Sequence, residues 1–198
     1  MFRTISFASI LIGAALATIP AFAQETGRSE VSVQAFGSFV KTTTDNGIQQ
    51  TATNSGGVLA NYRFFFTGSS GVEVNYGYSL NTQSYGLPSG FLGVKSNQHE
   101  VTAAYVYRRA FHHFTPFVEA GVGALVFDPS DAPGASTQSR AAFVYGGGAD
   151  FNLTKRLFLR AQYRGLVYNS PTFDLTQALG ADRATHRAEP SVGFGYRF

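Results

Sequence analysis

The chain has 198 residues, of which 44% are hydrophobic, 15% aromatic and only 14% charged, so it is neither a disordered polyelectrolyte nor a highly charged soluble domain. Its 22 glycines, 19 phenylalanines and 10 tyrosines favour short strands and turns over a helical bundle. The absence of cysteine excludes disulfide frameworks, thiolate zinc sites and cysteine nucleophiles. The net charge of +3 comes from scattered basic residues, whereas nucleic-acid binding needs a clustered basic face, so we expect no nucleic-acid partner.

The first residues have the pattern of an export signal. Arg3 supplies a positive charge, an apolar run extends over 5–19, and the small-x-small pattern at 21–23 suits signal peptidase. The run is shorter than the roughly 20 apolar residues that span a bilayer as a helix. We therefore expect a signal peptide at 1–23 and one mature domain at 24–198, which is either soluble after export or spans a membrane by strands.

Apolar and polar residues alternate with a period of two over eight segments. In 71–81, valine, tyrosine and leucine occupy every even position, while Glu73, Asn75 and other polar or small residues occupy every odd position. Seven more segments alternate in the same way, with Leu59 and Phe65 as exceptions in the second. Segments of about ten residues match tilted transmembrane strands. The eight predicted strands are 30–39, 58–67, 71–81, 100–108, 115–126, 140–151, 157–167 and 186–198.

The connections between these segments alternate in length. Short turns are predicted at 67–71, 109–113 and 152–155, and long polar connections at 42–56, 81–98, 128–139 and 169–185. An up-and-down barrel with short periplasmic turns and longer external loops has this pattern, whereas a soluble sandwich has no reason to alternate so regularly. We expect the long connections to be solvated tips rather than a buried lid.

A soluble lipocalin-like barrel also has alternating strands, but it turns its apolar residues inward. Alternation alone therefore does not orient the two faces. The predicted signal peptide, the alternating connections, the density of Phe and Tyr on one face and the terminal Phe198 favour a membrane barrel with its apolar face on lipid. The prediction is an all-β, eight-stranded antiparallel up-and-down transmembrane β-barrel in a Gram-negative type of outer membrane.

Two pieces of the sequence resemble a known family. GGGADFNLTKRLFLRAQYRGL at 146–166 is similar to the strand-turn-strand region of the small eight-stranded outer-membrane barrels related to the OmpA transmembrane domain and the opacity-type surface proteins, and the ending GFGYRF resembles their last strand. The resemblance implies an integral envelope protein. We expect the barrel only, so the peptidoglycan-binding activity of OmpA is not carried over.

Some small barrels that resemble this one act on lipid acyl chains with a His, a Ser and a carboxylate, so each histidine was considered. His112 and His113 are adjacent in a short turn and do not converge well on one ion. His99 and His186 are each followed closely by a glutamate of opposite strand parity. We expect no catalytic residue, metal or cofactor, and a non-enzymatic protein. A lipid-modifying enzyme and a narrow solute channel remain the alternatives.

Charged residues on the polar faces suggest a closed lumen. Eight strands enclose little more than their own side chains, and buried charges persist only when they are paired. We therefore expect ion pairs between hairpin neighbours and no steady open pore; alternatively, some of these groups reach water at the barrel ends. The diagonal candidate pairs are Arg63 with Glu73, Arg108 with Glu119, and Asp150 with Arg160.

The carboxyl terminus resembles an assembly signal. Phe194, Tyr196 and Phe198 share one strand face with Val192, and such a terminal pattern resembles the signal that the outer-membrane insertion machinery recognises. The open edge of the last strand is a natural template for a partner strand. Alternatively, Phe198 is an interfacial girdle aromatic. The expected partners are outer-membrane lipids and the insertion machinery; we expect a monomer, and the sequence does not identify an external ligand.

Overall fold

The computed structural model describes residues 28–45, 48–87, 90–131, 134–173 and 183–198. The signal peptide predicted at 1–23 lies outside these ranges and stays a prediction. Among the described residues, no helix has the length and apolar character needed to cross a bilayer. The strands are β1 (Ser29–Val40), β2 (Thr43–Asp45), β3 (Ile48–Ala52), β4 (Ser55–Phe65), β5 (Ser70–Leu87), β6 (Gly90–Arg108), β7 (Phe114–Pro129), β8 (Gln138–Asn152), β9 (Leu157–Asn169) and β10 (Ala184–Arg197).

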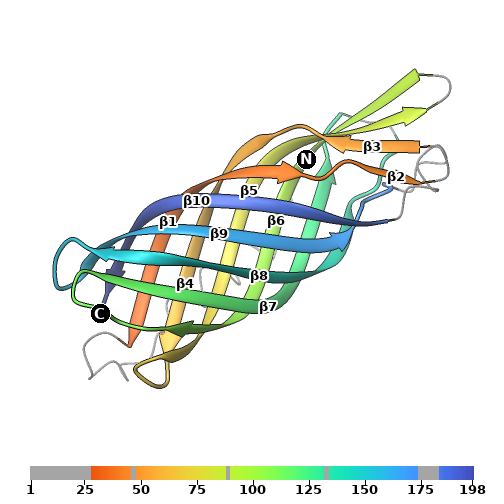
Figure 1. Ribbon diagram of the computed structural model, residues 1–198. Helices are drawn as coiled ribbons and strands as arrows, with labels where there is room; N and C mark the ends of the chain where they lie inside the picture. The colour runs from red at the N-terminus through yellow and green to blue at the C-terminus, as the bar shows by residue number, and fades with distance from the viewer. Residues whose placement is uncertain (1–27, 46–47, 88–89, 132–133, 174–182) are drawn as a thin grey trace, which may run out of the picture.

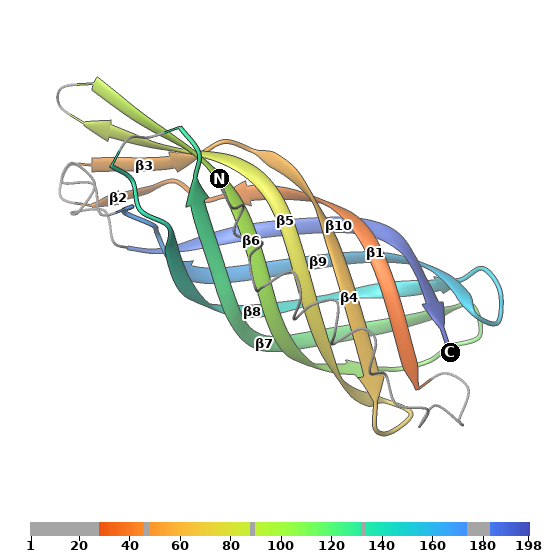
Figure 2. The same cartoon turned by 180° about the vertical axis from the view of Figure 1, so that it is seen from behind.

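Eight of these strands close into an antiparallel barrel. Apart from β2 and β3, each strand pairs with its neighbours in chain order, and β1 pairs with β10. Figure 1 and its reverse view in Figure 2 show inclined strands, with the short turns and the C-terminus at one end and the long connections at the other. Closure pairs every barrel strand on both sides, which removes the free edges. The predicted eight-stranded up-and-down barrel is confirmed.

The two faces of the barrel wall have opposite polarity. Outward-facing Val33 and Phe194 are 59% and 60% exposed, whereas inward-facing Gln34 and Glu119 are 1% and 5% exposed. Leu59 and Phe65, the exceptions in the predicted alternation, are buried in the lumen. A hydrocarbon exterior around a polar interior is the arrangement of a membrane barrel and the inverse of a soluble one.

Two connections that the sequence predicts to be polar loops contain strands. Within 42–56, β2 and β3 form a hairpin, and β3 pairs with β5. Within 81–98, β5 and β6 remain paired as far as Leu87 and Gly90. The prediction was wrong because these strands extend beyond the apolar band of the wall. Their outward side chains are mostly polar or glycine, so the hydrophobic period of two is lost although backbone pairing continues.

The start of the last long connection also departs from prediction, because it is buried. Residues 170–173 are buried between β9 and β10, and the Phe173 side chain is fully enclosed. Its backbone adopts a φ of 53°, a left-handed conformation that costs a non-glycine residue of order 1 kcal/mol or more and that persists only where the surroundings hold it. This segment is therefore a lid over the lumen rather than a solvated tip.

Glycine allows the close approach of neighbouring strands around the lumen. Gly121 on β7 lies opposite Ala104 on β6, and a Cβ atom at Gly121 would lie 2.1 Å from the carbonyl oxygen of Ala103. At Gly146 on β8, a Cβ atom would lie 3.0 Å from Oε1 of Glu119. Small residues at these positions leave space for backbone and for long charged side chains.

We predict that Gly121→Ala lowers the free energy of unfolding by about 1–3 kcal/mol, since the added methyl group meets rigid backbone. Gly68→Ala is the matched control, because a Cβ atom there meets nothing within 4 Å; we expect a change within about 0.5 kcal/mol. Urea unfolding of the refolded protein in detergent micelles measures both. Equal stabilities of the two variants would contradict the close packing described for β6 and β7.

Candidate functional site

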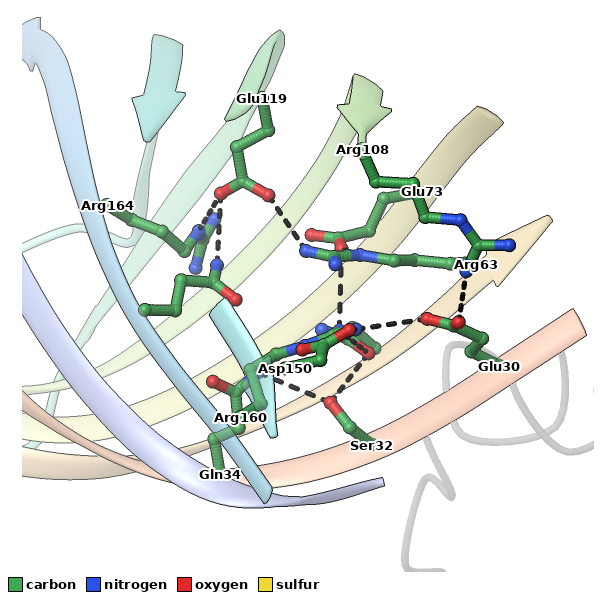
Figure 3. A network of polar contacts seen from close by, with 12 residues as sticks. Glu30, Ser32, Gln34, Arg63, Glu73, Arg108, Glu119, Asp150, Arg160 and Arg164 are labelled. Carbon is green, nitrogen blue, oxygen red and sulfur yellow. Dashed lines mark hydrogen bonds and ion pairs between the residues drawn. The ribbon is translucent and has the colours of Figure 1, made fainter. Parts of the chain in front are cut away.

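The lumen is the candidate functional site, because the inward side chains of all eight barrel strands meet there. It has two layers. A charged layer extends from the short-turn end to the middle of the barrel, and Figure 3 shows part of it. An apolar layer lies at the opposite mouth, beneath the long connections.

Arg63 is the first link in the charged layer. It lies directly opposite Glu73 in the β4–β5 register, and their side chains form an ion pair. Arg63 Nη2 also donates to Glu119 Oε2 at 3.2 Å (Figure 3), and the guanidinium carbon lies 3.9 Å from the centroid of the Phe117 ring. Arg63 and Glu73 thus lie directly opposite each other rather than on the predicted diagonal, and Arg63 also contacts a third strand through Glu119.

Arg160 is the central cation of this layer. It lies directly opposite Asp150, to which Nε and Nη2 donate at 2.6 and 2.8 Å. Arg160 Nη2 also donates to Glu30 Oε2 on β1 at 3.1 Å, and Nη1 lies 4.0 Å from Glu73 Oε2. One fully buried guanidinium therefore joins carboxylates from three other strands, and Figure 3 shows it at the meeting point of these side chains.

The predicted pair between Arg108 and Glu119 is not formed. In the β6–β7 register Arg108 lies opposite Phe117, so Glu119 is on the expected diagonal. Arg108 instead forms an ion pair with Glu30, and its guanidinium carbon lies 3.4 Å from the centroid of the Phe65 ring. The side chain stays at the short-turn end, where this ring and the β1 carboxylate hold it, while Glu119 pairs with cations of β4 and β9.

A second ion cluster lies nearer the apolar layer, and the sequence analysis did not single out its members. Arg164 on β9 donates from Nη1 to Glu189 at 3.1 Å and also pairs with Glu100 on β6. Arg187 on β10 pairs with the same two carboxylates. Inward strand parity was the available signal for these residues. Glu189 lies directly opposite Arg164 in the β9–β10 register, so hairpin geometry reaches this pair. Glu100 on β6 comes from across the lumen, which reasoning from single hairpins does not reach.

The charges in the ion network of the lumen balance. The four fully buried arginines and all six carboxylates have side chains at most 2% exposed, while Arg108 and Arg197 at the short-turn end are 13% and 14% exposed. Balance matters because an unpaired buried charge is strongly destabilising. Six carboxylates pair with six arginines in this network. The carboxylates are Glu30, Glu73, Glu100, Glu119, Asp150 and Glu189, and the arginines are Arg63, Arg108, Arg160, Arg164, Arg187 and Arg197.

The apolar layer closes the mouth of the barrel around Phe173. Tyr85 Oη donates to the carbonyl oxygen of Pro171 at 2.7 Å, and Gln138 Oε1 accepts a hydrogen bond from the Phe173 backbone N–H at 2.9 Å. Side chains from β5 and β8 thus hold the buried lid segment in place. The buried members of this layer are Tyr85, Val94, Leu125, Phe127, Ala142, Val144, Leu166, Tyr168 and Phe173.

The histidines take no part in the ion network. His99 and His186 each share a hydrogen bond with a tyrosine hydroxyl, at 2.8 and 3.0 Å. His112 and His113 lie in the exposed β6–β7 turn with ring centroids 4.5 Å apart. Over the part of the chain that the structure describes, no group of three or more His, Cys, Asp and Glu could hold a metal ion.

The three residues of the candidate assembly signal lie on the outer wall or at its end. Phe194 and Phe198 are 60% and 45% exposed, and the rings of Tyr196 and Phe198 pack edge to face with centroids 5.3 Å apart. The Phe198 backbone N–H donates to the carbonyl oxygen of Ser29 at 3.0 Å. In the finished barrel, the last residue is therefore tied to the first strand.

Comparison with known proteins agrees with this architecture. The family model for the outer membrane protein beta-barrel domain matches residues 9–198. No curated protein matches the chain in sequence. OprG from Pseudomonas aeruginosa is 18% identical with a TM-score of 0.61, and the match covers 88% of this chain and 97% of OprG.

Two other solved structures have the same fold. Neisserial surface protein A is 13% identical with a TM-score of 0.63, and the match covers 88% of this chain and 100% of that protein. Ail of Yersinia pestis, solved in complex with the heparin analogue sucrose octasulfate, is 20% identical with a TM-score of 0.52, over 88% of this chain and 100% of Ail. At these identities, the likeness shows the fold alone.

We predict that Arg160→Met lowers the free energy of unfolding by about 3–5 kcal/mol, because it leaves buried carboxylates without their central cation. Adding Asp150→Leu restores equal numbers of cations and anions, so the double variant should recover part of the loss. Lys155→Met in the exposed β8–β9 turn is the control, with a change within about 0.5 kcal/mol. Urea unfolding measures the free energy of unfolding of all three variants. If Arg160→Met alone were as stable as Lys155→Met, the dry ion network would be refuted.

Proposed function

The chain belongs to the family of outer membrane protein β-barrel domains, and from its filled lumen we propose that it is a non-enzymatic integral outer-membrane protein without a steady open pore. Its role is then envelope structure or surface interaction. The observation that carries this proposal is the matched set of lumen charges, which join opposite strands by direct contact.

Two barriers in series support a closed barrel. A solute entering from the long-connection end meets the apolar layer around Phe173, which is fully buried. A solute that passed this layer would have to separate the ion pairs of Arg164 and Arg160, which link strands across the lumen. Separating buried ion pairs without replacing their partners costs several kcal/mol for each charge.

The interaction surface in this proposal is the end that carries the long connections. There the β2–β3 hairpin and the tip of the β5–β6 hairpin project beyond the barrel (Figure 1). Loops on a rigid barrel vary without disturbing the strand ladder, which makes them the usual place for binding in such proteins. The lipid-modifying enzyme has less support, since His99 and His186 share hydrogen bonds with tyrosine hydroxyls.

Planar-bilayer recording tests the closed lumen, and we expect no stable conductance steps from the folded protein. Phe173→Ala should also fail to conduct, because the charged layer still closes the barrel when the apolar layer is weakened. Heat-modifiable mobility on a detergent gel verifies that each sample is folded. Stable openings of the wild-type protein would support the narrow channel instead, and altered acylation of lipid A on mass analysis would support the enzyme.

The assembly role of the last strand is part of the same proposal. Before β10 pairs with β1, its backbone edge is open and can pair with a strand of the insertion machinery. Phe194, Tyr196 and Phe198 would supply the outward side chains of this recognition. The girdle alternative makes Phe198 a contributor to the stability of the finished barrel instead.

Phe198→Ala separates these two roles while it keeps the backbone contact to Ser29. We expect nearly unchanged thermal unfolding of protein refolded in detergent, but slower insertion in cells and accumulation of unfolded protein in the periplasm. Phe151→Ala is the matched control, because Phe151 is also an exposed outer-wall aromatic, at 45%; it should insert normally. Efficient insertion of Phe198→Ala at low expression would show that recognition does not need this ring.

A further inference from the structure

Among the described residues, the excess positive charge is concentrated at the short-turn end. The ion network in the lumen contributes no net charge, because its six carboxylates and six arginines balance. Among the described residues outside this network, the short-turn end carries four basic side chains and no acidic one. The basic side chains are Arg28, Arg109, Lys155 and Arg156. The opposite end is close to balanced, with Lys41, Lys95, Arg140 and Arg183 against Asp45, Asp128 and Asp131.

Most of these cations form a continuous arc along the barrel rim. The β6–β7 turn and the β8–β9 turn are joined by a hydrogen bond from the Asn152 N–H to the His113 carbonyl oxygen at 3.1 Å, and β10 is joined to the second turn through the carbonyl oxygen of Arg156. We call this arc the cationic rim, and all of its side chains are exposed. It consists of Arg109, Lys155 and Arg156, with His112 and His113 in the first of the two turns.

Apolar side chains adjoin the cationic rim on the membrane side. Phe111 and Phe114 are 45% and 42% exposed, with stacked rings whose centroids are 5.1 Å apart, and Leu153 in the other turn is 53% exposed. The Arg109 guanidinium carbon lies 5.5 Å from the centroid of the Phe111 ring. Exposed aromatic and aliphatic groups at a barrel end lie at the boundary of the hydrocarbon. The cations beside them therefore lie at the level of the lipid headgroups.

We propose that the cationic rim binds the phosphate groups of anionic phospholipids in the leaflet at the short-turn end. The proposal rests on the membrane-spanning barrel above and adds a lipid class to it. Basic side chains at a membrane surface attract anionic headgroups, and this attraction weakens with ionic strength. The position of the cations beside lipid-facing side chains favours a lipid over an acidic soluble partner. Because the cations lie in turns, replacing them should leave the hydrogen bonds between the strands unaffected.

The test uses the full mature chain reconstituted in vesicles that contain spin-labelled phosphatidylglycerol or phosphatidylcholine. For the wild-type protein at pH 7.5 and low salt, we expect about a threefold preference for phosphatidylglycerol at the protein surface. At a salt concentration of 1 M, the ratio of bound phosphatidylglycerol to bound phosphatidylcholine should fall to about one. It should also fall to about one in a triple variant, Arg109→Gln with Lys155→Gln and Arg156→Gln.

The matched control is a triple variant at the opposite end, Lys41→Gln with Lys95→Gln and Arg183→Gln, which should keep the preference. A wild-type protein that binds both lipids equally, a rim variant that keeps the preference, or a control variant that loses it would each overturn the proposal. Heat-modifiable mobility of the same samples reports whether the barrel itself has formed. Failure of lipid selection is thereby distinguished from failure of the barrel.

Discussion

The rest of the structure depends on the matching of buried charges inside a narrow barrel. Six arginines and six carboxylates lie in the lumen, and each meets an opposite charge from another strand. Removing either partner would leave an unpaired ion in a region buried from bulk solvent. Arginine suits this role because its planar fork reaches several carboxylates at once, as Arg160 does with Asp150 and Glu30. The network thus links strands that the backbone ladder leaves apart.

The environment of a side chain depends on the face of the barrel wall that carries it and on its position along the barrel axis. Outward side chains such as Val33 and Phe194 face hydrocarbon, while inward ones form the charged layer and then the apolar layer under Phe173. These contacts occupy the interior, and the long connections and the short turns lie at its two ends. One end carries projecting hairpins, and the other carries the cationic rim beside exposed aromatic rings. In the proposed function, the closed interior therefore leaves recognition to the ends of the barrel.

The sequence predicted the eight strands and their faces, because each membrane-embedded strand contacts lipid on one side and the polar lumen on the other. The same signal failed within 81–98, where the outward side chains are polar or glycine although pairing continues. Hairpin geometry brought Arg63 near Glu73, but the contact of Arg160 with Glu30 depends on closure of the whole ring. Phe173 gave no periodic signal, since a single aromatic residue in a polar connection does not reveal that it folds inward.

Hydrogen exchange of the arginine side chains tests the central claim most directly, because it reports whether water reaches the network. In a dry, paired lumen, the Nε–H groups of Arg160 and Arg164 exchange far more slowly than that of the exposed Arg109 in the β6–β7 turn. Two-dimensional NMR of the refolded barrel in micelles, followed after transfer to deuterated buffer, resolves these groups. Strong protection of Arg160 and Arg164 is the predicted result. Exchange of both as fast as that of Arg109 would mean a hydrated lumen and would contradict the closed barrel.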